Sequence, residues 1–105
     1  MHRVALKAYM PDVTALPSLI VALSARLREE GCEAVRRPSW VVANCRGALV
    51  KASLYAHLPA ARPTIELEGS LTVEVEGERS EDVVRLTEAV TEALEGAGAG
   101  VTLHG

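Results

Sequence analysis

Residues 48–58, Ala-Leu-Val-Lys-Ala-Ser-Leu-Tyr-Ala-His-Leu, alternate between apolar and polar side chains. Successive side chains of a strand point to opposite faces, so this alternation is typical of a strand with one buried and one exposed face. The positions expected to face a core are Val50, Ala52, Leu54, Ala56 and Leu58. The positions expected on the other face are Lys51, Ser53, Tyr55 and His57.

A second alternating stretch, residues 64–76, follows a loop at 59–63. The positions expected to face the core are Ile65, Leu67, Leu71, Val73 and Val75. Those expected on the exposed face are Glu66, Glu68, Thr72, Glu74 and Glu76. Within the stretch, Gly69-Ser70 predicts either a bulge or a hairpin turn, and Gly77 ends the run.

The N-terminal half adds a strand, a helix and a meander. Alternation predicts a strand over 3–10, and leucines at helical spacing predict a helix over 14–30, with Pro17 in its first turn and Gly31 after its end. Residues 32–58 read as three strands. The predicted strands are 32–37, 40–45 and 48–58, joined by turns at Pro38-Ser39 and Arg46-Gly47.

A second helix is predicted over 81–95. Ser80 is a good N-cap, and the acidic residues Glu81 and Asp82 suit the positive end of the helix dipole. Residues 101–104 form either a short last strand or a frayed end.

The order strand, helix, three or four strands, helix predicts a two-layer α+β sandwich. An antiparallel sheet of four to six strands would carry both helices on one face. The alternative is a ferredoxin-like βαββαβ fold, in which residues 101–104 supply the final strand.

Length and composition narrow the class of protein. The 105 residues fit one domain, and 49% hydrophobic with 24% charged residues excludes a disordered tail or a membrane-embedded chain. The sequence has neither an uncharged stretch of about 20 apolar residues nor the pattern of a secretion signal, so we expect a cytoplasmic protein and no membrane partner. Only three residues are aromatic, Tyr9, Trp40 and Tyr55, which argues against a stacking platform for single-stranded nucleic acid.

Charge divides the chain into two halves. Residues 1–62 hold nine Lys and Arg against four acidic residues, a net charge of +5, whereas residues 63–105 hold two against ten, a net charge of −8. We expect the two halves to fold against each other.

The segment Gly77-Glu-Arg-Ser-Glu-Asp82 resembles the junction that precedes the second helix in each repeat of the TATA-box-binding protein family. The resemblance covers residues 64–95 by motif and most of the chain by element order, and it implies that fold. In the family, the open sheet face binds a bent minor groove through apolar residues that include phenylalanine. Here that face carries four glutamates and the chain has no Phe, so we expect no nucleic-acid binding.

The chain has two cysteines, Cys32 and Cys45. A turn centred on Pro38-Ser39 makes them cross-strand neighbours, close enough to oxidise. We expect two reduced thiols in a cytosolic core, and the spacing predicts no structural zinc.

Five residues of the exposed sheet face are the candidate partner-binding site: Lys7, Tyr9, Lys51, Tyr55 and His57. Tyrosine is an amphipathic anchor, and Lys and His supply charge. The alternative is a solvated face held by Lys–Glu pairs. Ser53 and His57 lie about 13 Å apart along one strand, which excludes a catalytic dyad.

These observations predict a small protein-interaction or assembly module without catalytic residues, cofactor or metal. Self-association as a homodimer is the expected form, because an uncovered face and edge strands are commonly hidden by association. The alternatives are a small-ligand-binding regulatory domain with its site at a dimer cleft, and an enzyme that uses the region of Tyr55 and His57.

Overall fold

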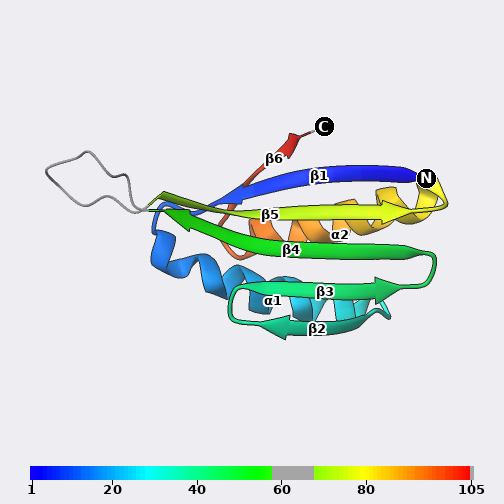
Figure 1. Ribbon diagram of the computed structural model, residues 1–105, viewed down its shortest axis with the longest axis horizontal. Coiled ribbons are helices and arrows are strands. Elements are labelled where there is room, and N and C mark those ends of the chain that lie inside the picture. The colour runs from blue at the N-terminus through cyan, green and yellow to red at the C-terminus, as the bar shows by residue number, and fades with distance from the viewer. Residues whose placement is uncertain (58–67, 105) are drawn as a thin grey trace, which may run out of the picture.

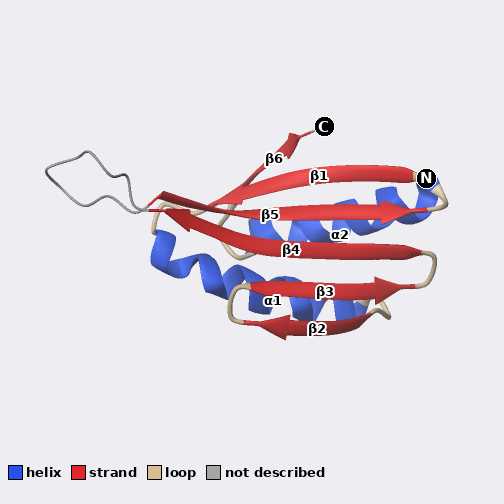
Figure 2. Cartoon of the chain, viewed as in Figure 1, coloured by secondary structure: helices blue, strands red, loops and turns tan. Residues whose placement is uncertain are grey.

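The computed structural model describes residues 1–57 and 68–104 (Figure 1). The strands and helices follow the predicted order, with a 3-10 turn before the first helix (Figure 2). The elements are β1 (His2–Tyr9), the 3-10 turn (Val13–Ala15), α1 (Leu16–Glu29), β2 (Glu33–Arg37), β3 (Trp40–Cys45), β4 (Ala48–His57), β5 (Glu68–Gly77), α2 (Ser80–Gly96) and β6 (Gly100–His104).

The strands form one antiparallel sheet of six strands in the described part of the chain, in the order β2-β3-β4-β5-β1-β6. Both helices lie on the same face of this sheet (Figure 1). The predicted α+β sandwich is confirmed, and its last strand forms. Four strands lie between the helices, so the ferredoxin-like alternative, which has two there, is wrong.

The alternation of β4 and β5 is confirmed wherever their side chains are described. Leu71, Val73 and Val75 of β5 are fully buried beneath the helices, as is Val50 of β4, while Lys51 is exposed. The sequence also predicts which way the side chains of residues 56–58 and 65–68 face. These side chains lie outside the described part of the chain. The inward residues of both strands therefore form the floor of the core.

The helices close that core with aliphatic side chains spaced three and four residues apart. The buried residues of α1 and α2 include Leu19, Ile20, Leu23, Leu27, Leu86, Val90 and Leu94. The first turn of the predicted helix over 14–30 is a 3-10 turn instead, because the Asp12 side chain accepts hydrogen bonds from the backbone N–H and the hydroxyl of Thr14.

Two local predictions are wrong. Gly69 and Ser70 pair one-to-one with Ala56 and Tyr55, so they form neither a bulge nor a turn, because ladder pairing with the long β4 overrides the weak strand preference of glycine. Ser80 is not the N-cap of α2. Arg79 has the extended backbone of the capping position, and Ser80 is the first helical residue.

The hairpin of β2 and β3 has the predicted register, in which Val35 opposes Val42 and Arg37 opposes Trp40. Cys32, just before β2, and Cys45, at the end of β3, are joined by a disulfide bond. The expectation of two reduced thiols is therefore wrong. Both sulfurs lie in the core on the helix side of the sheet, where the opposed positions bring their Cα atoms within 4.3 Å.

Ion pairs join the oppositely charged halves, as expected. Arg26 of α1 contacts Glu92 of α2 at 2.9 Å, and Arg85 of α2 lies 3.5 Å from Glu30 at the end of α1. These contacts set the two helices side by side over the sheet.

Among the described residues, no helix combines the length and the apolar composition that a membrane span requires.

Candidate interaction surface

The sheet face that the helices leave uncovered is called the open face here. It carries the outward residues of all six strands, and the register places them in rows across the sheet. One row runs from Val35 of β2 through Val42 and Lys51 to Glu74 of β5. The next row runs from Arg37 through Trp40, Ser53 and Thr72 to Lys7 of β1. The open face therefore has an apolar end over β2 and β3 and a charged end over β5 and β1.

At the charged end of the open face, ion pairs between neighbouring strands compensate the charges. Arg3 of β1 donates a hydrogen bond to Glu76 of β5 at 3.1 Å, and the Lys51 ammonium group lies 3.6 Å from the other Glu76 oxygen. The hydrogen bond from Arg3, with the nearby Lys51 charge, holds the pKa of Glu76 below its ordinary value. The same contact raises the pKa of Arg3. This part of the predicted face is thus the ion-paired ladder that the sequence offered as an alternative.

Four of the five predicted partner-binding residues lie on the open face. Tyr9 and Tyr55 are 44% and 59% exposed, Lys51 is exposed, and Lys7 is half-buried beside Thr72. The side chain of His57 lies outside the described residues.

These residues do not form one cluster, because β5 separates them. Lys51 and Tyr55 belong to β4, on one side of β5, whereas Lys7 and Tyr9 belong to β1, on the other. At about 4.8 Å between neighbouring strands, the two groups are roughly 10 Å apart. Any partner that contacts both groups also contacts β5.

The apolar end of the open face was not among the predicted site residues. Val35 is 52% exposed, Trp40 and Val42 are each 37% exposed, and the Arg37 guanidinium lies 5.8 Å from the centre of the Trp40 ring. The sequence signal is the run Trp40-Val41-Val42, which is apolar on both faces of its strand. An exposed Trp beside an Arg is typical of a protein-binding surface.

A shallow hollow of about 320 Å³ adjoins these residues. Its walls are Trp40, Val42, Lys51, Ala52, Ser53, Thr72 and Glu74. It joins the apolar end of the face to the charged end, so one ligand surface can engage both.

No protein-family model matches the sequence, and no curated protein matches it. Among solved structures, the chain is similar to the NMR structure of PA4090 from Pseudomonas aeruginosa, with a TM-score of 0.62. The two share 8% sequence identity, and the match covers 99% of this chain and 96% of that one. At this identity the likeness shows the fold alone.

The described residues contain no group of three or more His, Cys, Asp or Glu placed to hold a metal ion. On the open face, Glu76 contacts Arg3 and Lys51 instead. What this surface offers chemically is contact area and charge.

Proposed function

We propose that this protein is a protein-interaction and assembly module, without catalytic activity, that associates with copies of itself. The observation that carries the proposal is where its exposed large apolar side chains lie. Among the described residues, most of them lie on the open face or at the two outer edges of the sandwich. Tyr9, Val35, Trp40, Val42 and Tyr55 lie on the open face, and Val21 and Leu103 lie at the edges.

This distribution supports association because the free energy falls when another surface removes exposed apolar groups from water. The outer strands add a second reason, since within the described chain neither β2 nor β6 has a neighbouring strand on its outer side. On β2, the Ala34 and Arg36 carbonyls already accept hydrogen bonds from the Arg28 and Arg37 side chains. The outward Lys7, Tyr9, Lys51 and Tyr55 belong to the proposed surface together with Val35, Trp40 and Val42.

Sedimentation velocity on the full chain over the micromolar range tests self-association. We expect a sedimentation coefficient that rises with protein concentration. A species of 11.2 kDa at every concentration would contradict the proposal.

Photo-cross-linking in cells tests the open face. A photoreactive amino acid at position 42 is expected to capture a protein, whereas the same group at position 46, in the β3–β4 turn, serves as the control. Absence of any cross-link from position 42 would remove the open face from the proposal.

A cytoplasmic location stays a proposal, and the Cys32–Cys45 bond argues against it. Disulfides persist mainly in oxidising compartments, whereas cytosolic thiols are kept reduced. Subcellular fractionation decides between the cytoplasm and an oxidising compartment.

A second candidate function, small-ligand binding, is favoured by a groove between α2 and β6. This groove has a volume of about 380 Å³ and mainly apolar walls, and the Thr87 hydroxyl near it is buried without a hydrogen-bond partner among the described residues. Such a site suits a small apolar molecule with one polar group. A thermal-shift screen tests it, because a ligand at 100 times its Kd stabilises by about 2.7 kcal/mol.

We do not propose nucleic-acid binding. Glu74 and Glu76 lie on the open face, where carboxylates oppose a phosphate backbone. The relation to the TATA-box-binding protein fold stays a proposal supported by element order.

A further inference from the structure

The groove between α2 and β6 is bounded by short side chains on the helix. The core side of α2 carries Leu86, Val90 and Leu94, whereas the side turned toward β6 carries Thr87 and Thr91. A threonine side chain is too short to fill the space that a leucine would occupy at these positions. A groove of about 380 Å³ therefore remains between the helix and the outer strand.

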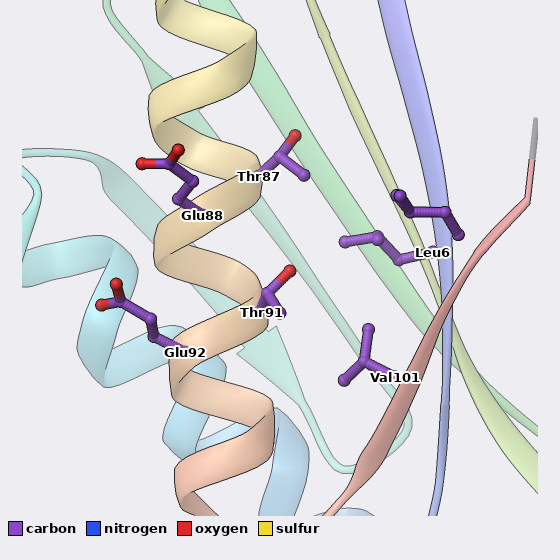
Figure 3. Close-up of a pocket in the computed structure, with 7 residues that line it drawn as sticks. Leu6, Thr87, Glu88, Thr91, Glu92 and Val101 are labelled. Atoms are coloured by element: carbon purple, nitrogen blue, oxygen red, sulfur yellow. The ribbon is translucent and has the colours of Figure 1, made fainter.

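Apolar side chains form the wall opposite the two threonines. Leu6 of β1 and Val101 of β6 point toward Thr87 and Thr91 across the groove (Figure 3). Leu103 of β6 also lines the groove and is 72% exposed. One wall thus carries hydroxyl groups and the other carries aliphatic carbon, an arrangement that suits a ligand with a hydrocarbon body and one polar group.

The Thr87 hydroxyl is the group that points to a ligand. Its oxygen is buried and has no hydrogen-bond partner within the described residues. A buried hydroxyl without a partner is unfavourable compared with one that is hydrogen-bonded. Because Thr87 lines the groove, a molecule bound there can supply the missing partner.

The spacing of Thr87 and Thr91 suits a single oxygen atom of a ligand. Residues four apart in a helix have Cβ atoms about 5–6 Å from each other on one side of the helix. An O–H···O hydrogen bond spans about 2.8 Å, so one oxygen placed between the two hydroxyls can bond to both. A ligand hydroxyl fits this position because it accepts a hydrogen bond from one threonine and donates one to the other.

The charges around the groove favour an uncharged ligand. No Lys, Arg or His is among the described residues that line it. Its two carboxylates, those of Glu88 and Glu92, extend from α2 away from Leu6 (Figure 3), and Glu92 contacts Arg26 of α1. An anion in the groove would therefore lack a counter-charge, and a cation there would not meet the carboxylates. Burying an unpaired charge costs more free energy than burying a hydroxyl.

We propose that the groove between α2 and β6 binds a neutral aliphatic alcohol. The ligand hydroxyl lies between the hydroxyls of Thr87 and Thr91, and the hydrocarbon chain covers Leu6, Val101 and Leu103. This inference rests on the small-ligand binding proposed for the same groove, and it assigns the chemical class of the ligand and the residues that recognise it.

Probes of equal chain length that differ in their head group test the class of ligand. They are 1-octanol, octanoate and octylammonium, each titrated into the full chain below its aggregation concentration and followed by the NMR signals of the backbone amides. We expect saturable shifts at Thr87, Thr91 and Leu103 with 1-octanol, and binding of either ion that is at least about tenfold weaker. Each methylene removed from the alcohol is expected to weaken binding about fourfold.

The variant T87V tests the recognising hydroxyl, because it removes that group and keeps the shape and the helix propensity of the side chain. We expect T87V, and likewise T91V, to bind 1-octanol about threefold to tenfold more weakly than wild type, since one hydrogen bond is lost. The matched control is T102V on the open-face side of β6, where Thr102 opposes Lys7, and it should bind as wild type does. Circular dichroism checks that all three variants fold.

Octanoate or octylammonium that binds as tightly as 1-octanol overturns the proposed class and leaves small-ligand binding in the groove standing. Wild-type affinity in both T87V and T91V overturns the assigned role of the threonines, as does a set of shifts centred away from the groove. If none of the probes binds, the inference fails. Small-ligand binding itself fails only when the wider thermal-shift screen also finds no ligand.

Discussion

Cys32 and Cys45 lie directly opposite each other across the β2–β3 hairpin and are covalently joined, with their Cα atoms 4.3 Å apart. The bond closes the hairpin at the end opposite its Pro38-Ser39 turn. It ties the outer strand β2, which has a partner on one side only, to the rest of the sheet.

Loss of this disulfide is expected to destabilise the protein. The two cysteines are 13 residues apart, and closing a loop of that size restricts the unfolded chain by about 3 kcal/mol. The double variant C32S/C45S, or wild type in reductant, should therefore unfold at lower urea concentration, measured by circular dichroism at a fixed protein concentration. The double variant itself should not respond to reductant. Equal midpoints for wild type with and without reductant would contradict this expectation.

Gly77 lies where three segments meet, and a side chain there has no room. An added Cβ would be 2.8 Å from the Gly47 carbonyl oxygen and 3.2 Å from Val83. We expect G77A to lower the free energy of unfolding by about 1–3 kcal/mol, as overpacking does elsewhere. The control is G96A at the end of α2, where nothing lies within 4 Å of the added atom and stability should hold or rise slightly. Equal stabilities of G77A and wild type would show that the β3–β4 turn moves aside at little cost.

Ser24 of α1 carries a buried hydroxyl that has no hydrogen-bond partner within the described residues. An unsatisfied buried hydroxyl is unfavourable, and alanine has the higher helix propensity, so S24A should raise the free energy of unfolding by about 1 kcal/mol. The comparison variant is S18A, which removes a hydroxyl that donates to the Ala15 carbonyl at 2.6 Å and should give no such gain. Thermal melts of the three proteins measure this, and a lower melting temperature for S24A would reveal a contact for that hydroxyl.

The sheet was predictable because period-2 alternation fixes which side of a strand is buried. Leu71, Val73 and Val75 on one side of β5 and Glu74 and Glu76 on the other follow from spacing alone. Cap positions depend on one residue's backbone angles, and for this reason Ser80 was misplaced by one position. The redox state of Cys32 and Cys45 was not predictable, because a thiol pair and a disulfide leave the same pattern in a sequence.

The candidate surface was predicted less completely than the fold. Alternation placed Tyr9 and Tyr55 on the open face, but only the strand order shows that β5 separates them. Val35 and Val42 are aliphatic, a residue type that is usually found in the core. They are exposed because they lie on the open face of the β2–β3 hairpin, which the helices do not cover. The groove between α2 and β6 required knowing that β6 is an outer strand.

Glu76 is expected to make the stability of the folded protein depend on pH. Its pKa is lowered below the ordinary value of 4.5 in the folded protein, chiefly by the Arg3 hydrogen bond, so its contribution is present above that value and is lost as the pH falls through the lower, folded pKa. Wild type should therefore be more stable than E76Q at neutral pH, and the difference should shrink as the pH drops below about 4.5. Urea unfolding across this range measures the effect. The control is E78Q, an exposed carboxylate with no ion pair in the described part, whose difference from wild type should change less. A constant gap between wild type and E76Q down to strongly acidic pH would mean that the Arg3 contact does not form in solution.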